Sequence, residues 1–226
     1  MNLTISVIFQ MCNSAGFIRR AMESILAQNV SSLEILVVDD NSEDSSVAIA
    51  SNYPDVKIIQ LPKSGLGEAR NQGVKAASGD FIAFLDADDY WTIDKLKMQL
   101  DYLSKTPDCT AVVGLMNRFL SEGCQLPTNY NSEMLAKPTP AYIPSALITR
   151  HCVFEQIGLF DSSLAVGCDS DWMMRLLDSN NNVYLLPQVI LNKRIHNNNI
   201  SSQVTIYQQE LLKVLRRSLQ RRGYVS

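Results

Sequence analysis

Long apolar runs are missing from this sequence. No stretch approaches the roughly 18 consecutive apolar residues that suggest a membrane-spanning helix. The opening stretch MNLTISVIFQM lacks the basic segment and the apolar core of a secretory signal. The five cysteines are scattered and form no Cys-x-x-Cys pair, which argues against a disulfide framework and a zinc site. We therefore expect a protein of the reducing cytoplasm.

Two further absences narrow the function. The net charge is −3, so the chain lacks the basic excess that nucleic-acid-binding proteins use, and we expect no nucleic-acid partner. Neither of the glycine-rich phosphate loops, GxxxxGK[ST] and GxGxxG, occurs in the chain. If the protein binds a nucleotide, groups other than a glycine-rich loop must therefore bind its phosphates.

The composition is that of a globular domain. Of the 226 residues, 46% are hydrophobic and 19% are charged, which is enough for a sizeable core. The first hundred residues alternate short apolar runs with amphipathic patterns. The predicted strands are Ile5–Met11, Ile35–Asp39, Val56–Leu61 and Phe81–Leu85, and the predicted helices are Phe17–Gln28, a helix capped by Ser42, Gly67–Ala77 and a helix capped by Thr92. Apolar strands separated by helices indicate an α/β fold, with a mostly parallel central sheet and helices on both faces.

The second half has a different pattern. Proline, asparagine and serine crowd residues 125–145. The elements that we expect after them are short strands at Ala146–Ile148, Val183–Leu186 and Val189–Ile195, and a helix at Ser170–Leu177. Nothing near residue 115 is flexible enough to separate two domains. We predict a single domain, 1–226, with a first half (1–115), a smaller second half (116–204) and a terminal helix (205–226).

Two acidic clusters follow predicted strands. Asp39 and Asp40 end the second strand, and Asp86, Asp88 and Asp89 follow the fourth. Ligands of parallel sheets bind beyond the carboxyl ends of the strands, which is where both clusters fall. Hard cations such as Mg²⁺ bind one or two carboxylates together with substrate phosphates. The second cluster therefore indicates a metal that holds a diphosphate, whereas the first is equally well explained as a solvated turn.

A signalling module is the alternative. The stretch ILVVDDNS resembles the opening of response-regulator receiver domains, in which Asp86 would be the phosphorylated residue. Receivers begin at that strand, however, and here a full strand and helix precede it. We therefore keep a receiver-type module as the minor alternative.

Several motifs in order resemble one enzyme family. SVIFQMCNSAGFIRRAMESILAQ, ILVVDDNSEDSS, GLGEARNQGVKAASGDFIAFLDADDYW, PSALITRHCVFEQIGLFD and RIHNNNIS are similar to segments of family 2 glycosyltransferases with the GT-A fold. The resemblance spans roughly residues 3–202, and agreement of several ordered motifs is more specific than one Asp-x-Asp. It implies a nucleotide-sugar-binding first half and an acceptor-side second half. The implied reaction is metal-dependent, inverting transfer from a nucleotide diphosphate sugar, expected to be a UDP-sugar, to an acceptor hydroxyl.

The resemblance also implies roles for the metal motif. Asp88 is expected to bind Mn²⁺ or Mg²⁺ directly, and Asp86 to contact the ribose or the outer shell of the metal. Asp89 either supports this site or faces solvent. His196, in RIHNNN, is expected to return to the metal or the diphosphate, although a lone histidine is more often structural.

The remaining donor residues come from four segments. The expected donor-binding residues are Gln10, Asn13, Asp39, Asp40, Arg70, Asp86 and Arg194. Asp40 matches the position that binds the base, and Asp39 is expected to orient the turn. Arg70 and Arg194 are expected near the phosphates, with a surface salt bridge as the alternative for Arg70. Gln10 and Cys12 depart from the proline and tyrosine usual in the family.

The catalytic base is expected in GCDSDWMMRLL. Asp169 occupies the family's base position and is our prediction, with Asp171 as the alternative. Acids at a helix start also have a simpler explanation, because free N–H groups and the helix dipole favour them. A catalytically silent sugar-nucleotide-binding protein is the other alternative. The acceptor could be a carbohydrate, a glycolipid, a protein or a small molecule.

The terminal helix carries leucines and basic residues. Leu211, Leu212, Leu215 and Leu219 fall on one face, with Lys213, Arg216, Arg217, Arg221 and Arg222 nearby. We expect this leucine stripe to dock on the core, as in ordinary amphipathic helices. The alternative is an interfacial helix in peripheral contact with anionic lipid at the inner face of the membrane.

Overall fold

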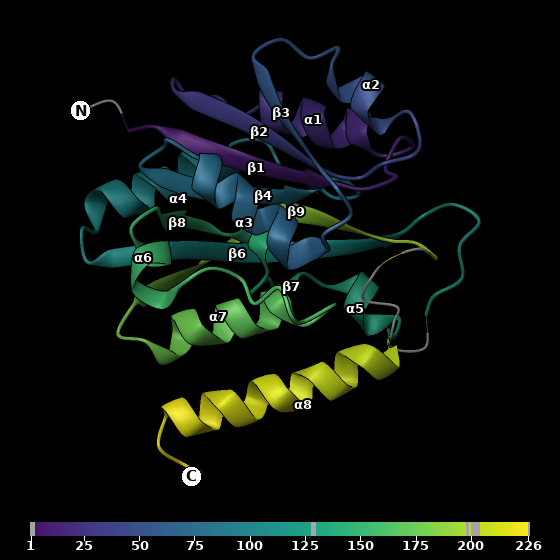
Figure 1. Ribbon diagram of the computed structural model, residues 1–226. Coiled ribbons are helices and arrows are strands. Elements are labelled where there is room, and N and C mark those ends of the chain that lie inside the picture. The colour runs from purple at the N-terminus through teal and green to yellow at the C-terminus, as the bar shows by residue number, and fades with distance from the viewer. Residues whose placement is uncertain (1–2, 128–129, 198, 200–203, 226) are drawn as a thin grey trace.

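One sheet forms the centre of the molecule. The computed structural model describes residues 3–127, 130–197, 199 and 204–225. Within this part the sheet has nine strands (Figure 1). From one edge to the other they are β3 (Val56–Leu61), β2 (Leu33–Asp40), β1 (Ile5–Met11), β4 (Phe81–Asp86), β8 (Ile148–Arg150), β6 (Cys109–Leu120), β9 (Asn182–Ile195) and β5 (Tyr90–Trp91), with β7 (Thr139–Pro140) paired to β6.

Helices cover both faces of this sheet. One face packs against α1 (Ile18–Leu26), α2 (Ser46–Ala50) and α4 (Lys95–Lys105), and the other against α3 (Leu66–Ala76), α6 (Val153–Ile157) and α7 (Cys168–Asp178). The long helix α8 (Val204–Arg221) lies along α7 as an outer layer (Figure 1). Short helical segments occur at α5 (Glu133–Ala136) and η1 (Pro144–Ala146). Side chains of β1 alternate between the two cores, Val7 and Phe9 in one and Ile8 in the other, as strand geometry requires.

The first half of the chain is parallel, as predicted. Strands β1, β2, β3 and β4 all pair in parallel, and their carboxyl ends bring both acidic clusters to one edge of the sheet. Beyond β4 the sheet is mixed, because β8 runs antiparallel to both β4 and β6, whereas β6 and β9 are parallel. Strands from both halves of the chain therefore share one sheet.

Several predicted boundaries are wrong, for local reasons. The helix expected from Ser42 begins at Ser46, because the backbone N–H groups of residues 42 and 43 donate hydrogen bonds to the side chains of Asp39 and Asn13 in a turn. The helix expected from Thr92 begins at Lys95, because the Thr92 hydroxyl bonds to β9 instead. The two strands expected in residues 183–195 are one strand, β9, whose pairing with β6 shifts register around its exposed proline, as a bulge allows. The strand expected at 146–148 starts at Ile148, after the 3₁₀ turn of η1.

The terminal helix docks through a different face from the predicted one. Leu212, Leu215 and Leu219 are exposed by 69%, 40% and 44%. The side chains that α8 buries include Val214 and Glu210. The expectation that the leucine stripe packs on the core is therefore wrong. Among the described helices, none is both long and apolar enough to cross a membrane.

Candidate active site

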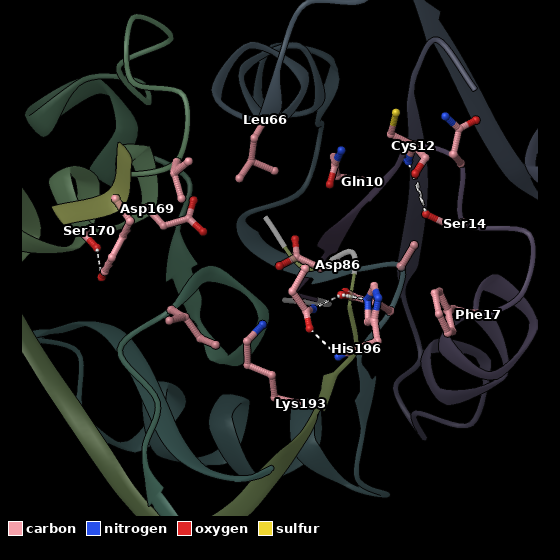
Figure 2. A pocket seen from close by; sticks show the side chains of 17 residues that line it. Gln10, Cys12, Ser14, Phe17, Leu66, Asp86, Asp169, Ser170, Lys193 and His196 are labelled. Atoms are coloured by element: carbon pink, nitrogen blue, oxygen red, sulfur yellow. Dashed lines mark hydrogen bonds and ion pairs between the residues drawn. The ribbon is translucent and has the colours of Figure 1, made fainter. Parts of the chain in front are cut away.

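A cavity of about 490 Å³ opens at the carboxyl ends of β1 and β4 (Figure 2). Of the predicted site residues, those that line it are Gln10, Asn13, Asp86, Asp88, Asp169 and His196. Those that do not are Asp39, Asp40, Arg70, Asp171 and Arg194. The predicted positions thus separate into a set that faces the cavity and a set behind it.

Asp88 and His196 meet at one side of the cavity. Asp88 follows β4, and His196 follows β9; the Asp88 Oδ2 atom lies 3.0 Å from His196 Nε2 and accepts a hydrogen bond from Asn199 Nδ2 at 2.9 Å. Burial alone would raise the pKa of Asp88. The hydrogen bond from His196 and the charge of Lys193 outweigh burial, so this pKa lies below its ordinary value and the carboxylate is ionised.

This pair suits a metal that also binds its substrate. Among the described residues no group of three or more His, Cys, Asp or Glu side chains could hold a metal ion alone. Asp88 and His196 supply two converging donors beside the cavity. Mg²⁺ typically takes one or two protein carboxylates and completes its shell with water and phosphate oxygens, and imidazole is an acceptable ligand for transition metals. The donor set therefore fits a divalent ion that shares its shell with a diphosphate.

A buried arginine behind the cavity joins two carboxylates that line it. Arg70 of α3 is fully buried; its Nη2 lies 2.7 Å from Asp86 Oδ1, and its Nη1 pairs with Asp169. The surface salt bridge considered for Arg70 is therefore wrong. Figure 2 shows Asp86 and Asp169 pointing toward the same space from opposite sides. A guanidinium with two parallel donor sets is suited to bridging two carboxylates in this way.

Asp169 and Asp171 have different surroundings. Asp169 lies in the first turn of α7, lines the cavity, and its side chain is 22% exposed. Burial raises the pKa of Asp169, the charge of Arg70 opposes that rise, and the net shift is upward. Asp171 points away from the cavity: it is buried and pairs with Arg175 at 2.8 Å, one helical turn on. Only Asp169 of this pair can contact a molecule in the cavity.

Lys193 was missed by the sequence analysis. Among the described residues that line the cavity, it is the only lysine or arginine. Its Nζ lies 3.3 Å from Asp89, which is buried rather than facing solvent and also accepts a hydrogen bond from the backbone of Arg194. Burial raises the pKa of Asp89 to about 7. Side chains alternate along β9, and Arg194, the neighbour of Lys193, does not line the cavity. The guanidinium of Arg194 contacts the rings of Phe17 and Phe119, and its Nε donates a hydrogen bond to the backbone oxygen of Asp88 at 3.0 Å.

The first acidic cluster organises backbone behind the cavity. Asp40 accepts hydrogen bonds from the backbone and hydroxyl of Ser64 at 2.6 and 3.0 Å and from the backbone of Gly65 at 3.1 Å, which fastens the start of α3 to the end of β2. Asp39 accepts two long hydrogen bonds, of 3.3 Å, from the backbone of Ser42. Asn13 lines the cavity and accepts a hydrogen bond at 2.8 Å from the backbone of the same turn.

Other lining residues carry no signal in the sequence. Ser170 of α7 and Tyr207 of α8 both line the cavity, with their hydroxyl oxygens 3.3 Å apart. Tyr207 lies more than thirty positions from Ser170 in the chain and belongs to no recognisable motif. The end of the late motif, residues 198, 200 and 201, lies outside the described residues.

Comparison with known proteins gives consistent results. The family model Glycosyl transferase family 2 matches residues 6–158. An uncharacterised glycosyltransferase of Rickettsia prowazekii is 30% identical over 205 residues, which cover 85% of this chain and 64% of the relative. The chain thus spans a little under two thirds of that relative's length.

Two solved structures share the fold. Residues 1–349 of Staphylococcus aureus TarS, in complex with UDP-GlcNAc, match 97% of this chain and 66% of that one, with a TM-score of 0.78 and 22% identity. The mannosyltransferase PcManGT of Pyrobaculum calidifontis, in complex with GDP-Man and Mn²⁺, matches 97% of this chain and 65% of that one, with a TM-score of 0.74 and 18% identity. The central sheet with its flanking helices is therefore of the GT-A type, as predicted.

Proposed function

The chain belongs to glycosyl transferase family 2, and we propose that it transfers a sugar from a nucleotide diphosphate sugar to a hydroxyl group of an acceptor. The observation that carries this proposal is one cavity with two chemically distinct sides. Asp88 and His196 offer metal ligands on one side, and Asp169, bridged to Asp86 through Arg70, offers an ionisable carboxylate on the other. The family match leaves the receiver-type module without support.

We assign the metal-side residues to the donor diphosphate. Asp88 and His196 would hold Mn²⁺ or Mg²⁺; when bound, the ion supplies positive charge that stabilises the leaving nucleotide diphosphate. The complex of PcManGT with GDP-Man and Mn²⁺ supports a divalent ion at such a site. We propose Lys193, rather than Arg194, as the protein cation nearest the phosphates, because its side chain faces the cavity and that of Arg194 does not.

The nucleotide is assigned to the edge of the cavity beside Gln10 and Asn13. TarS binds UDP-GlcNAc and PcManGT binds GDP-Man, so the two neighbours differ in their base. We propose a UDP-sugar for this chain, with Asp40 in base recognition. Because the carboxylate of Asp40 already holds Ser64 and Gly65, its part includes shaping the wall that the base meets. Asp39 shapes the adjoining turn, and Asp86 contacts the ribose or the outer shell of the metal.

The chemical step requires one base. The acceptor oxygen forms a bond to the anomeric carbon as the bond between that carbon and the diphosphate oxygen breaks. Asp169 takes the hydroxyl proton, and the electron pair of the broken bond leaves with the nucleotide diphosphate. A single displacement of this kind inverts the anomeric configuration. The raised pKa of Asp169 makes it a stronger base than an ordinary carboxylate, while the charge of Arg70 favours its ionised form.

The acceptor is assigned to the side of the cavity beside Ser170 and Tyr207. These hydroxyls lie close to Asp169 and suit a polyhydroxylated molecule, so a carbohydrate or glycolipid fits, as does the hydroxyl of a protein or small molecule. Closing the cavity around such an acceptor excludes the competing nucleophile, water.

The outer face of α8 suits an anionic lipid surface. Leu212, Leu215 and Leu219 form an exposed stripe beside the exposed side chains of Lys213 and Arg216, while the opposite face of the helix is docked on α7. Apolar side chains next to cations are the pattern of helices that bind at membrane surfaces, and each cation near an anionic surface contributes about 1 kcal/mol. We therefore propose peripheral contact of this face with anionic membranes.

A panel of nucleotide sugars tests the function. The protein is incubated with each sugar nucleotide, Mn²⁺ and water or simple glycosides, and release of nucleotide diphosphate is measured. Turnover with one or a few donors supports the proposal. Tight binding without turnover, across the panel and with a range of acceptors, indicates the catalytically silent protein instead.

A further inference from the structure

Helix α8 reaches the cavity from the far end of the chain. It is separated from the motifs that match the family model, which end at residue 158. Yet Tyr207 of α8 lines the cavity, and the Glu210 carboxylate, one turn further along the helix, is buried against the segment that leads into α7. The mechanism proposed above gives no role to Glu210.

The Glu210 carboxylate binds three successive backbone amides. Its Oε1 accepts a hydrogen bond from Ala165 N at 2.8 Å, and its Oε2 accepts hydrogen bonds from Val166 N at 2.9 Å and Gly167 N at 2.7 Å. A side chain at position 167 would meet this arrangement, because a Cβ there would lie 3.1 Å from Glu210 Cβ, so the glycine permits the close approach. Hydrogen bonds to an ionised acceptor are about twice as strong as neutral ones.

These amides lead directly into the first turn of α7. Gly167 caps the helix, no side chain within α7 caps it, and Asp169 is two residues further on. The negative charge of Glu210 near this helix start also has the sign that the helix dipole favours. Hydrogen bonds that the backbone donates lower the pKa of Glu210 despite its burial, so the carboxylate is ionised at neutral pH. Val166 itself lines the cavity.

The other end of α7 is fastened to α8 as well. Asp178 accepts hydrogen bonds from Ser218 at 2.9 Å, Arg221 at 2.9 Å and Arg222 at 2.6 Å. Val214, between the two groups of contacts, is fully buried. The two helices are therefore joined at both ends, and Glu210 holds the backbone that leads into the first turn of α7.

We propose that Glu210 is a positioning residue for the proposed reaction: by binding the amides of residues 165–167, it holds the first turn of α7 so that Asp169 faces the acceptor. The inference rests on the proposed role of Asp169 as the base. Placement of a base matters because a shift of about 1 Å in a reacting group can lower a rate roughly a hundredfold.

The test compares Glu210→Gln with Val214→Ala. The glutamine keeps the size of the side chain but removes the charge and turns one acceptor into a donor that faces N–H groups. The alanine loosens the same helix in its apolar contact and leaves residues 165–167 alone. Cys168 and Cys109, both buried, report local and global opening, because Cys168 is next to Asp169 and Cys109 lies in β6. Reaction with a thiol reagent is followed at each cysteine by peptide mass spectrometry.

In Glu210→Gln we expect labelling of Cys168 to rise roughly tenfold or more relative to Cys109, and kcat to fall roughly tenfold or more with the donor KM nearly unchanged. In Val214→Ala we expect the ratio of the two labelling rates and kcat to stay near wild type.

Unchanged Cys168 labelling in Glu210→Gln would overturn the inference, and so would increased labelling with a normal kcat. Absence of turnover in the wild type, by contrast, refutes the proposed function, and the labelling then decides alone whether Glu210 holds this turn.

Discussion

Removing the charge of Arg70 should move the pH dependence of the reaction. In Arg70→Gln the guanidinium that contacts Asp86 and Asp169 is lost. Two unit charges about 4 Å apart interact with about 4 kcal/mol at an effective dielectric constant of about 20, which corresponds to about three pKa units. The Asp169 side chain is 22% exposed, so water reduces this effect. The repulsion from Asp86, which loses the same partner, raises the pKa of Asp169 in the same direction. Because water screens both contributions, we expect a net rise of about one to two units.

The sign follows from the role of Asp169. A base must be ionised, so activity is lost as the pH falls through its pKa; a higher pKa makes the loss set in at a higher pH. The acidic limb of kcat/KM in Arg70→Gln should therefore lie about one to two pH units above that of wild type. Arg70→Lys keeps the positive charge but lacks the planar guanidinium with its several donors. Its acidic limb of kcat/KM should stay much closer to that of wild type.

The assay is initial nucleotide diphosphate release across a series of buffers of equal ionic strength. Breaking a buried ion pair costs about 3–5 kcal/mol, a large part of the roughly 5–15 kcal/mol of a typical domain. Circular dichroism at each pH must therefore show that the variant is folded. An acidic limb that does not move in folded Arg70→Gln would refute the idea that Arg70 tunes Asp169.

Three further predictions concern the donor and the membrane. EDTA should abolish activity, Mn²⁺ or Mg²⁺ should restore it, and Asp88→Ala should lose metal-supported nucleotide binding in calorimetry; equal binding by the folded variant would remove Asp88 from the metal site. Wild type should prefer UDP over GDP and ADP, and Asp40→Ala should weaken that preference, whereas equal wild-type affinity for all three nucleotides would contradict base recognition. Wild type should co-sediment with vesicles of anionic phosphatidylglycerol and not with phosphatidylcholine, and Leu215→Ser should reduce this binding; sedimentation that ignores lipid charge or the substitution would argue against the α8 contact.

Much of the first half could be predicted because its signals are local. The strands at residues 5–11 and 56–61 were placed at their observed bounds, since each is a short apolar run between polar turns. The acidic residues after β2 and β4 reach the same edge because the strands are parallel. Asp169 could be preferred over Asp171 only through the family resemblance, and the geometry now separates them: one faces the cavity and the other pairs with Arg175.

The features that were missed depend on tertiary packing. Leucines on one face of a helix predict a buried stripe, but α8 instead buries Val214 and Glu210. Glu210 is buried because its carboxylate accepts hydrogen bonds from backbone N–H groups just before α7. Lys193 was passed over for its neighbour because the direction in which each side chain of β9 points depends on the register of the strand in the sheet. The long strand β6 was missed as well, since it pairs with residues far along the chain.

The most direct test of the central claim compares Asp169→Asn with Asp171→Asn. Both substitutions remove one charge from the first turn of α7, but only Asp169 lines the cavity. Loss of a general base typically lowers the rate ~10²–10⁴-fold with little effect on binding. The measurement is the rate of sugar transfer or donor hydrolysis at saturating donor and Mn²⁺, with donor affinity determined separately by calorimetry. The account predicts that Asp169→Asn binds donor normally and is at least roughly a hundredfold slower, while folded Asp171→Asn stays close to wild type. Near-normal turnover in Asp169→Asn, together with collapse in Asp171→Asn, would contradict it.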